Sequence, residues 1–241
     1  MELLIRLDYD FAALSKRSNS TMHQFGFLEI AMRQNDLAIE VRNYLRSHPN
    51  ASVVNLGCGL DQTAENNTNE SNKIYNIDMP DVIKVRNELL PETERIRNIG
   101  TDLNDTTWFN EIDDSNGVVF IAAGVFYYFK KTQIQKLFNA MAKRFKGGVL
   151  AFDTANKSAV KLMLKTWVKE AGITDIDSYF YVSDMNRDLN TWLKNARAGY
   201  KGYMLGYNDL KTKSVSGFFR FLAKLGDGMM KMKIVRIEFD K

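Results

Sequence analysis

A short apolar run that ends in two glycines, followed by a second apolar run that ends in an acid, limits the folds open to this chain. The first run, Val53–Leu56, leads into Gly57-Cys58-Gly59, and the second, Ile74–Ile77, leads into Asp78. Short runs of this kind, bounded by turn residues, are typical of buried strands. Glycines after a strand let a ligand approach the backbone, because no Cβ stands in the way. The pattern predicts a nucleoside-binding turn at the carboxyl edge of a parallel sheet.

The acid and a missing third glycine narrow the choice of ligand. Asp78 lies about 20 residues after the turn, where a carboxylate accepts hydrogen bonds from ribose hydroxyls. A dinucleotide-binding turn needs a third glycine three positions after Gly59, and Gln62 occupies that place. A phosphate-binding Gly-Lys-Ser/Thr loop is also absent from the sequence. S-adenosylmethionine, a nucleoside joined to an amino acid without a phosphate, therefore fits the turn best, and S-adenosylhomocysteine would be its product.

Apolar runs alternate with helical patterns, which predicts an α/β fold with a mainly parallel sheet. Strands are expected at 53–56, 74–77, 96–99, 118–122, 148–152, 179–182 and 230–239. Helices are expected at 26–46, at 132–145 with a capping box of Thr132 and Gln135, and at 158–170 from Ser158 onward. In the last strand the apolar alternation changes phase at Val235, which predicts a bulge or burial on both faces.

The length of 241 residues fits one globular unit. Within it we expect an N-terminal helical segment or lid over 1–50 and a ligand-binding domain over 51–241. No apolar stretch approaches the roughly 18 residues of a membrane span, and the first residues lack a signal-peptide pattern. Cys58 is the single cysteine, so no internal disulfide can form, and a cytoplasmic location is expected.

Charge is distributed unevenly along the chain. Residues 1–120 hold 11 Lys/Arg against 19 Asp/Glu, and residues 121–241 hold 22 against 10. The acidic half suits a cofactor with a sulfonium cation, and the basic half is consistent with an anionic substrate or with solvated lysine-rich helices. No basic cluster is interleaved with aromatics as in a nucleic-acid-binding module. We therefore expect a small-molecule substrate, no nucleic acid, no membrane and no metal site, and the oligomeric state stays open.

Several further segments give the chain a family likeness. Together with the glycine turn, the segments 78–83, Arg86, 91–95, Trp108, 123–129 and 152–153 resemble the S-adenosylmethionine-dependent O-methyltransferases grouped with leucine carboxyl methyltransferases and tetracenomycin-type polyketide methyltransferases. The likeness covers roughly residues 8–153 in the same order. It implies the Rossmann-like class I methyltransferase fold, with a seven-stranded, mainly parallel sheet, an antiparallel last strand and an N-terminal helical lid.

The resemblance also implies roles for individual residues. Arg33 matches an arginine that reaches the carboxylate of the cofactor's methionine part, with a surface arginine as the alternative. Asp102 and Leu103 fit the position that contacts the adenine amino group, whereas Asp105 is the rival and a more typical cap. Asp61 would orient the turn or cap a helix, and Cys58 would fill space. The expected cofactor-binding residues are Arg33, Asn55, Gly57, Cys58, Gly59, Asp61, Asp78, Met79, Asp102, Leu103 and Ala123.

No catalytic residue is specified by the sequence. A carboxylate acceptor needs no general base, whereas a hydroxyl or phenol usually does. Tyr127, Tyr128 and His23 are candidates for contact with substrate, and each also fits a packing role; His48 fits a helix end or the surface. The expected reaction is methyl transfer to a carboxylate or to a phenolic or hydroxyl oxygen of a polyketide-like or other secondary metabolite, with a slight preference for a carboxylate.

Two departures from the family leave other functions open. Gln62-Thr63 stands where relatives carry Thr-Arg, and Ala123 stands where many carry an acid. Both changes remove polar groups from the cofactor side, which is consistent with a degenerate methyltransferase fold that binds a ligand without catalysis. A nicotinamide-dependent oxidoreductase is disfavoured by Gln62 and by the lack of a Tyr-x-x-x-Lys pair.

Overall fold

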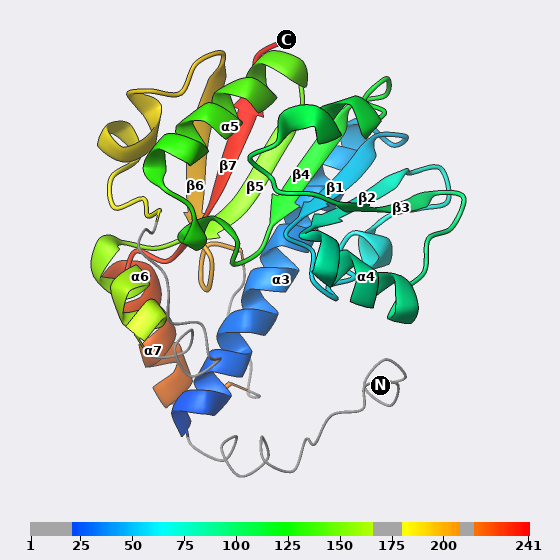
Figure 1. The fold of residues 1–241 in the computed structure, drawn as a ribbon. Coiled ribbons are helices and arrows are strands. Elements are labelled where there is room, and N and C mark those ends of the chain that lie inside the picture. The colour runs from blue at the N-terminus through cyan, green and yellow to red at the C-terminus, as the bar shows by residue number, and fades with distance from the viewer. Residues whose placement is uncertain (1–20, 166–179, 208–214) are drawn as a thin grey trace.

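The protein is built around one seven-stranded sheet (Figure 1). The structure, a computed structural model, describes residues 21–165, 180–207 and 215–241, and side chains from Gln24 onward. The strand order is β3-β2-β1-β4-β5-β7-β6. The strands are β1 (Ser52–Leu56), β2 (Ile74–Asp78), β3 (Ile96–Gly100), β4 (Val118–Ala122), β5 (Val149–Thr154), β6 (Ala196–Gly202) and β7 (Lys233–Phe239).

The strand directions match the expected mainly parallel sheet. β1 to β5 pair in parallel, and β7 pairs antiparallel with both β5 and β6. The β5–β7 register runs without interruption from Thr154 opposite Lys233 to Val149 opposite Glu238, so this pairing contains no bulge. Lys233, Ile234 and Val235 are all buried, because β7 is an interior strand. Burial on both faces therefore explains the change of phase seen in the sequence.

Helices cover the two faces of the sheet. The α-helices are α3 (Thr21–Ser47), α4 (Pro80–Leu89), α5 (Lys131–Arg144), α6 (Lys157–Met163) and α7 (Gly217–Gly228). Short helical turns span Glu65–Asn67, Thr106–Glu111, Phe126–Tyr128 and Asn186–Asn190. In Figure 1, α3 starts beside α7, where the rings of Phe25 and Phe219 lie 6.0 Å apart, and runs up to the sheet.

The two large hydrophobic cores lie on opposite faces of the sheet. One face of the sheet packs on α5 through Ile134, Leu137, Phe138 and Met141, which recur at helical spacing. The opposite face packs on α3 through Leu37, Val41 and Tyr44. Strands covered on both faces have nearly continuous apolar sequences, and for this reason β4 and β5 can be predicted from the sequence.

The sixth strand is where the sequence-based prediction is wrong. Residues 180–182 form no strand, although Phe180 and Val182 are buried, and residue 179 lies outside the described part. The strand is instead β6, at the edge of the sheet, where most side chains are exposed. An exposed edge strand with two glycines carries no apolar alternation, so periodicity does not reveal it.

Helix starts also differ from expectation. α5 begins at Lys131, and the Lys130 N–H donates to Gln133 Oε1 at 2.8 Å, so the expected Thr132–Gln135 box does not form the cap. α6 begins at Lys157 rather than Ser158, because the Asn156 side chain accepts a hydrogen bond from the Ala159 N–H. The expected residues 166–170 lie outside the described part, as do residues 1–20 of the expected lid.

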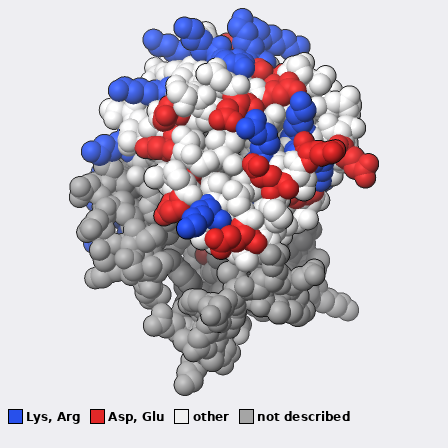
Figure 2. All heavy atoms as spheres, turned by 45° about the vertical axis from the view of Figure 1, so that its right-hand side comes forward, with Lys and Arg blue, Asp and Glu red and all other residues white. Residues whose placement is uncertain are grey.

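The surface reflects the uneven charge of the sequence. Figure 2 shows Asp and Glu side chains spread over the face that comes forward on the β3 side; Lys and Arg lie among them and gather at the upper rim. In the described part of the chain, no helix is long and apolar enough to cross a bilayer.

Candidate functional site

The glycine turn lies at the end of β1, and its backbone favours glycine at two positions. Gly57 has a φ of 62° and Gly59 a φ of 49°, the left-handed region that side chains disfavour. A Cβ on Gly57 would lie 2.5 Å from Val125 Cγ2. The N–H groups of Gly57 and Cys58 both donate to the Ile77 carbonyl, at 2.7 and 3.1 Å. The turn is therefore held at the end of β2, with Val125 packed against Gly57 and open space beside Gly59.

Asp78 lies beside this turn, as the sequence predicts. Its Oδ2 accepts a hydrogen bond from the Gly59 N–H at 2.7 Å, and its Oδ1 accepts one from the Met79 N–H at 2.8 Å. A carboxylate has about four acceptor positions, so two remain for a ligand. Met79 is 49% exposed next to it. The end of β2 thus presents an oriented carboxylate at the sheet edge.

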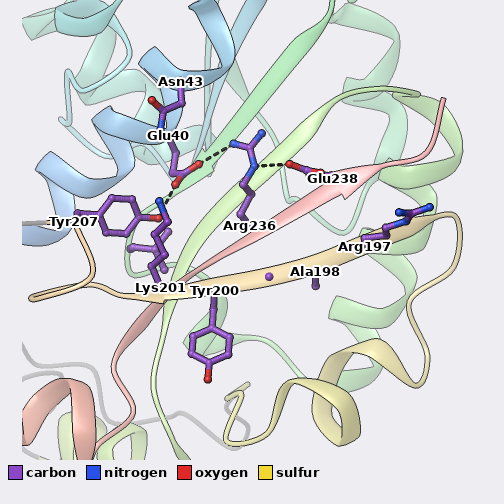
Figure 3. Close-up of a pocket in the computed structure, with 11 residues that line it drawn as sticks. Glu40, Asn43, Arg197, Ala198, Tyr200, Lys201, Tyr207, Arg236 and Glu238 are labelled. Carbon is purple, nitrogen blue, oxygen red and sulfur yellow. Dashed lines mark hydrogen bonds and ion pairs between the residues drawn. The ribbon is translucent and has the colours of Figure 1, made fainter. Parts of the chain in front are cut away.

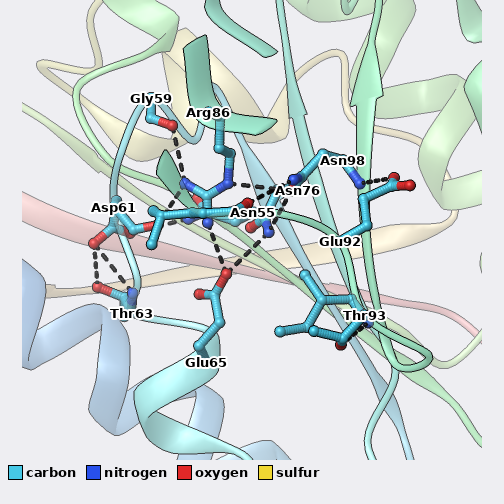
Figure 4. A network of polar contacts seen from close by, with 12 residues as sticks. Asn55, Gly59, Asp61, Thr63, Glu65, Asn76, Arg86, Glu92, Thr93 and Asn98 are labelled. Carbon is cyan, nitrogen blue, oxygen red and sulfur yellow. Dashed lines mark hydrogen bonds and ion pairs between the residues drawn. The ribbon is translucent and has the colours of Figure 1, made fainter. Parts of the chain in front are cut away.

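A buried arginine binds the backbone carbonyls of the turn (Figure 4). The Arg86 side chain, from α4, donates from Nη1 to the carbonyls of Gly59 and Asp61, both at 2.9 Å. Its Nη2 donates to Glu65 Oε1 at 2.7 Å, and its Nε donates to Asn98 Oδ1 at 3.2 Å. Because Arg86 is fully buried, these bonds replace its hydration. The sequence offered one signal for this role, an arginine three positions after Ile83 on the apolar side of a helix.

Asp61 orients the end of the turn. Its Oδ2 accepts from Asn55 Nδ2 at 2.9 Å, and its Oδ1 accepts from the N–H and hydroxyl of Thr63 at 3.1 and 2.8 Å. Of the two roles open from the sequence, the structure shows loop orientation. Asn55 is buried and acts within the protein through Asp61.

A second polar cluster lies at the ends of β4 and β5. Asp153 Oδ1 accepts from the Gly124 N–H at 2.6 Å, and Oδ2 accepts from the Tyr127 hydroxyl at 3.0 Å and from Arg33 Nη1 at 3.3 Å. Arg33 Nη1 lies 3.0 Å from the position of a Cβ on Gly124. The Arg33 Nε is buried and has no hydrogen-bond partner in the structure as described. Arg33 therefore points at the sheet edge and is not a surface arginine; Asp153 carried no expected role in this site.

Burial fixes the charge states in this cluster. It raises the pKa of the Tyr127 hydroxyl well above its usual range, and the charge of Asp153 adds to the effect. Burial opposes the charge of Arg33 and is the largest influence, but Asp153 together with Tyr127 and Tyr203 outweighs it, so the Arg33 pKa is raised. At neutral pH the cluster thus holds a charged guanidinium and a neutral tyrosine. Tyr127 is a hydrogen-bond donor to Asp153 and not a general base.

The other expected residues occupy separate places. The Asp102 carboxylate, just beyond β3, is exposed and accepts from the backbone and side-chain nitrogens of Asn104. Asp105 caps the Thr106–Glu111 turn by accepting from the Thr107 N–H. Leu103 is buried, Ala123 follows β4 and is partly exposed, and Tyr128 is 43% exposed. His48 is exposed and stacks on Tyr44, and the His23 side chain lies outside the described residues.

Cys58 is expected to be unreactive in the folded protein. Burial raises the pKa of its thiol to about 12, so almost none is thiolate at pH 8. We predict that a disulfide reagent such as Ellman's reagent modifies the native protein at least about 100 times more slowly than the urea-unfolded protein. Equal rates in the two states would show that Cys58 is accessible and not the space-filling residue that the structure shows.

A pocket elsewhere takes in none of the expected residues (Figure 3). It has a volume of about 400 Å³ and lies between α3 and the strands β6 and β7. Within it the buried Glu40 accepts from the Tyr207 hydroxyl at 2.6 Å and from Arg236 Nη1 at 2.7 Å. These bonds satisfy the Glu40 carboxylate within the protein. Within the described ranges, no group of three or more His, Cys, Asp or Glu residues is placed to hold a metal.

Sequence comparisons match the glycine turn and its surroundings to a known family. The model of the leucine carboxyl methyltransferase family matches residues 28–142. The tetracenomycin polyketide synthesis O-methyltransferase of Streptomyces glaucescens is 26% identical over 153 residues, or 63% of this chain and 54% of that protein. The chain thus spans about half the length of this curated relative. Both findings agree with the likeness seen in the sequence.

Solved structures share the fold. A protein from Thermobifida fusca superposes with a TM-score of 0.62 at 14% identity, over 88% of this chain and 82% of the other. The plantazolicin methyltransferase BpumL, in complex with S-adenosylhomocysteine, gives 0.57 at 15% identity, over 97% and 91%. Human N-acetylserotonin methyltransferase, in complex with S-adenosylmethionine, gives 0.54 at 11% identity, over 93% and 58%. At these identities the likeness concerns the fold.

Proposed function

This chain is related to the leucine carboxyl methyltransferase family, and we propose that it is an S-adenosylmethionine-dependent O-methyltransferase acting on a small molecule. The acceptor would be a carboxylate or a phenolic or hydroxyl oxygen of a polyketide-like or other secondary metabolite. We also propose that residues 1–50 form a lid that covers the site in the domain 51–241. The proposed location is the cytoplasm.

One observation supports the proposal most strongly: the order of polar groups along the sheet edge follows the order of groups in the cofactor. Asp102 follows β3, Asp78 ends β2, the glycine turn follows β1, and Arg33 reaches the ends of β4 and β5. Neighbouring strands in the order β3-β2-β1-β4-β5 thus offer groups suited to adenine, ribose, the ribose–sulfur link and the methionine carboxylate.

The individual groups also fit. The two free acceptor positions of Asp78 suit the two ribose hydroxyls. The Cβ position of Gly59 is open space, which leaves room for a ligand to approach the backbone there, whereas the bare Cα of Gly57 makes room for Val125. The guanidinium of Arg33, with its buried Nε unpaired in the described part, suits a carboxylate. The turn is less suited to a pyrophosphate, because Gln62 replaces the glycine that a dinucleotide-binding turn needs.

When bound, S-adenosylmethionine supplies an electrophilic methyl group on a sulfonium. The contribution of the protein would then be alignment, because in-line displacement depends mainly on holding the donor and the acceptor oxygen together. Arg33 and Asp78 fix the two ends of the donor. Arg86 fixes the turn between them, and Asp153 fixes Arg33.

Methyl transfer is tested directly with methyl-labelled S-adenosylmethionine and a panel of hydroxybenzoates and anthraquinone carboxylic acids. These probes offer both oxygen types, and alkaline hydrolysis removes a methyl ester but leaves a methyl ether. Label in either product is the expected result. The second candidate, a binding protein without catalysis, is motivated by Ala123 and Gln62 in the site. Micromolar cofactor binding with no transfer to any probe would favour it.

A further inference from the structure

One carboxylate near the sheet edge has no partner in the contacts described above. Glu29 lies on α3 one helical turn before Arg33, so the two side chains share a face of the helix. Glu29 is half-buried. No hydrogen bond or ion pair to its carboxylate is found among the described residues, whereas the nearby Asp153 has three hydrogen bonds. A desolvated carboxylate without a partner is costly unless a ligand supplies one.

Among the residues that the structure describes, no unpaired cation lies around Glu29. Arg33 is the nearby positive charge, and its guanidinium already pairs with Asp153. Tyr203, which follows β6, faces Glu29, and burial holds the pKa of its hydroxyl well above the usual range, so it stays neutral. The other ionisable groups around Tyr203 are Asp153 and Asp227, both acids. Burial raises the pKa of Glu29 to about 7, although the charge of Arg33 acts in the opposite direction.

We propose that Glu29 binds the α-ammonium group of the methionine part of the cofactor, beside Arg33, which binds the carboxylate. The inference rests on the proposed function. In an amino acid the ammonium and the carboxylate are attached to one carbon. Side chains one turn apart on a helix lie about 5–6 Å from each other at their Cβ atoms and can converge on two such groups. The pair Arg33 and Glu29 therefore matches a zwitterion in sign and spacing, while the partly exposed Ala123 at the end of β4 adds no charge.

The proposal is tested by calorimetric titration of the full chain with S-adenosylhomocysteine and with 5′-methylthioadenosine, which has the same nucleoside but no amino acid. We expect Glu29→Gln to weaken S-adenosylhomocysteine binding at least about tenfold at pH 8, the scale of one charge-assisted hydrogen bond. Binding of 5′-methylthioadenosine should change by less than about twofold, because it leaves this subsite empty. Glu94→Gln, the same change at an exposed position before β3, should alter neither affinity.

The pH dependence provides a second test. Since the folded-state pKa of Glu29 is about 7, wild-type affinity for S-adenosylhomocysteine should fall from pH 8 to pH 6 as the carboxylate is protonated, and Glu29→Gln should show a flat profile. The same raised pKa means that ionisation destabilises the fold above pH 7. Glu29→Gln should therefore raise Tm at pH 8 and leave it unchanged near pH 4.5, which separates lost binding from lost folding.

Each outcome decides between the two proposals. Unchanged S-adenosylhomocysteine affinity in Glu29→Gln, or equal losses for both ligands, would overturn the role of Glu29 and leave the proposed function standing. A wild-type protein that binds neither ligand would instead overturn the proposed function.

Discussion

Replacing Asp78 by alanine is expected to weaken S-adenosylhomocysteine binding at least about 100-fold. Two charge-assisted hydrogen bonds to the ribose hydroxyls would be lost, each worth about 1.5–3 kcal/mol, and every 1.4 kcal/mol is tenfold in affinity. The loss should be amplified because Asp78 also orients the turn by accepting from the Gly59 N–H at 2.7 Å. Calorimetry at a fixed pH and salt concentration measures the change.

Asp81→Ala is the matched control for Asp78→Ala. Asp81 lies in the first turn of α4, three positions further on, and is exposed. We expect the affinity of Asp81→Ala for S-adenosylhomocysteine to stay within about twofold of wild type, as for a surface substitution. A comparable loss in both variants, or less than a threefold loss in Asp78→Ala, would mean that the end of β2 does not bind the ribose.

Replacing the buried Arg86 by methionine is expected to lower the free energy of unfolding by about 3–5 kcal/mol, the usual cost of removing one partner of a buried ion pair. The change removes the charged partner of Glu65, whose side chain is 13% exposed. It also leaves the carbonyls of Gly59 and Asp61 without their donor. Urea unfolding measures the loss. Because the turn loses its support, cofactor affinity should fall as well, even under conditions where the variant is folded.

Two further variants separate charge from packing at Arg86. The double variant Glu65→Leu with Arg86→Met removes both charges and should recover part of the stability lost by the single change. Lys84→Met, on the exposed side of α4, should change the free energy of unfolding by less than about 0.5 kcal/mol. A single Arg86→Met variant as stable as wild type would show that the network in Figure 4 contributes little to the fold.

The sequence predicts β1, β2, β4 and β5 well because these interior strands are buried along almost their whole length. β1 to β5 all differ from the expected ranges by no more than two residues at either end, although β3 is an edge strand with exposed positions. β6 was missed for the opposite reason. Its side chains are mostly exposed, and its place is set by pairing with β7, a contact between segments about 35 residues apart.

The site divides in the same way. Gly57 and Asp78 are predictable because strand end, turn and acid follow one another locally in the chain. Arg86, Asp153 and Glu29 are not, because their roles depend on elements that meet only in the fold. Arg86 on α4 meets Glu65 and Asn98 from two other segments, and Asp153 of β5 meets Arg33 of α3 across 120 positions. A pattern within one element contains no information about such partners.

The most direct test of the account is a calorimetric titration of the wild-type protein with S-adenosylmethionine, S-adenosylhomocysteine and NAD. We expect micromolar binding of the first two and no binding of NAD, because the edge of the sheet suits a nucleoside joined to an amino acid and has Gln62 where a pyrophosphate needs glycine. Binding of NAD alone, or of none of the three, would contradict it.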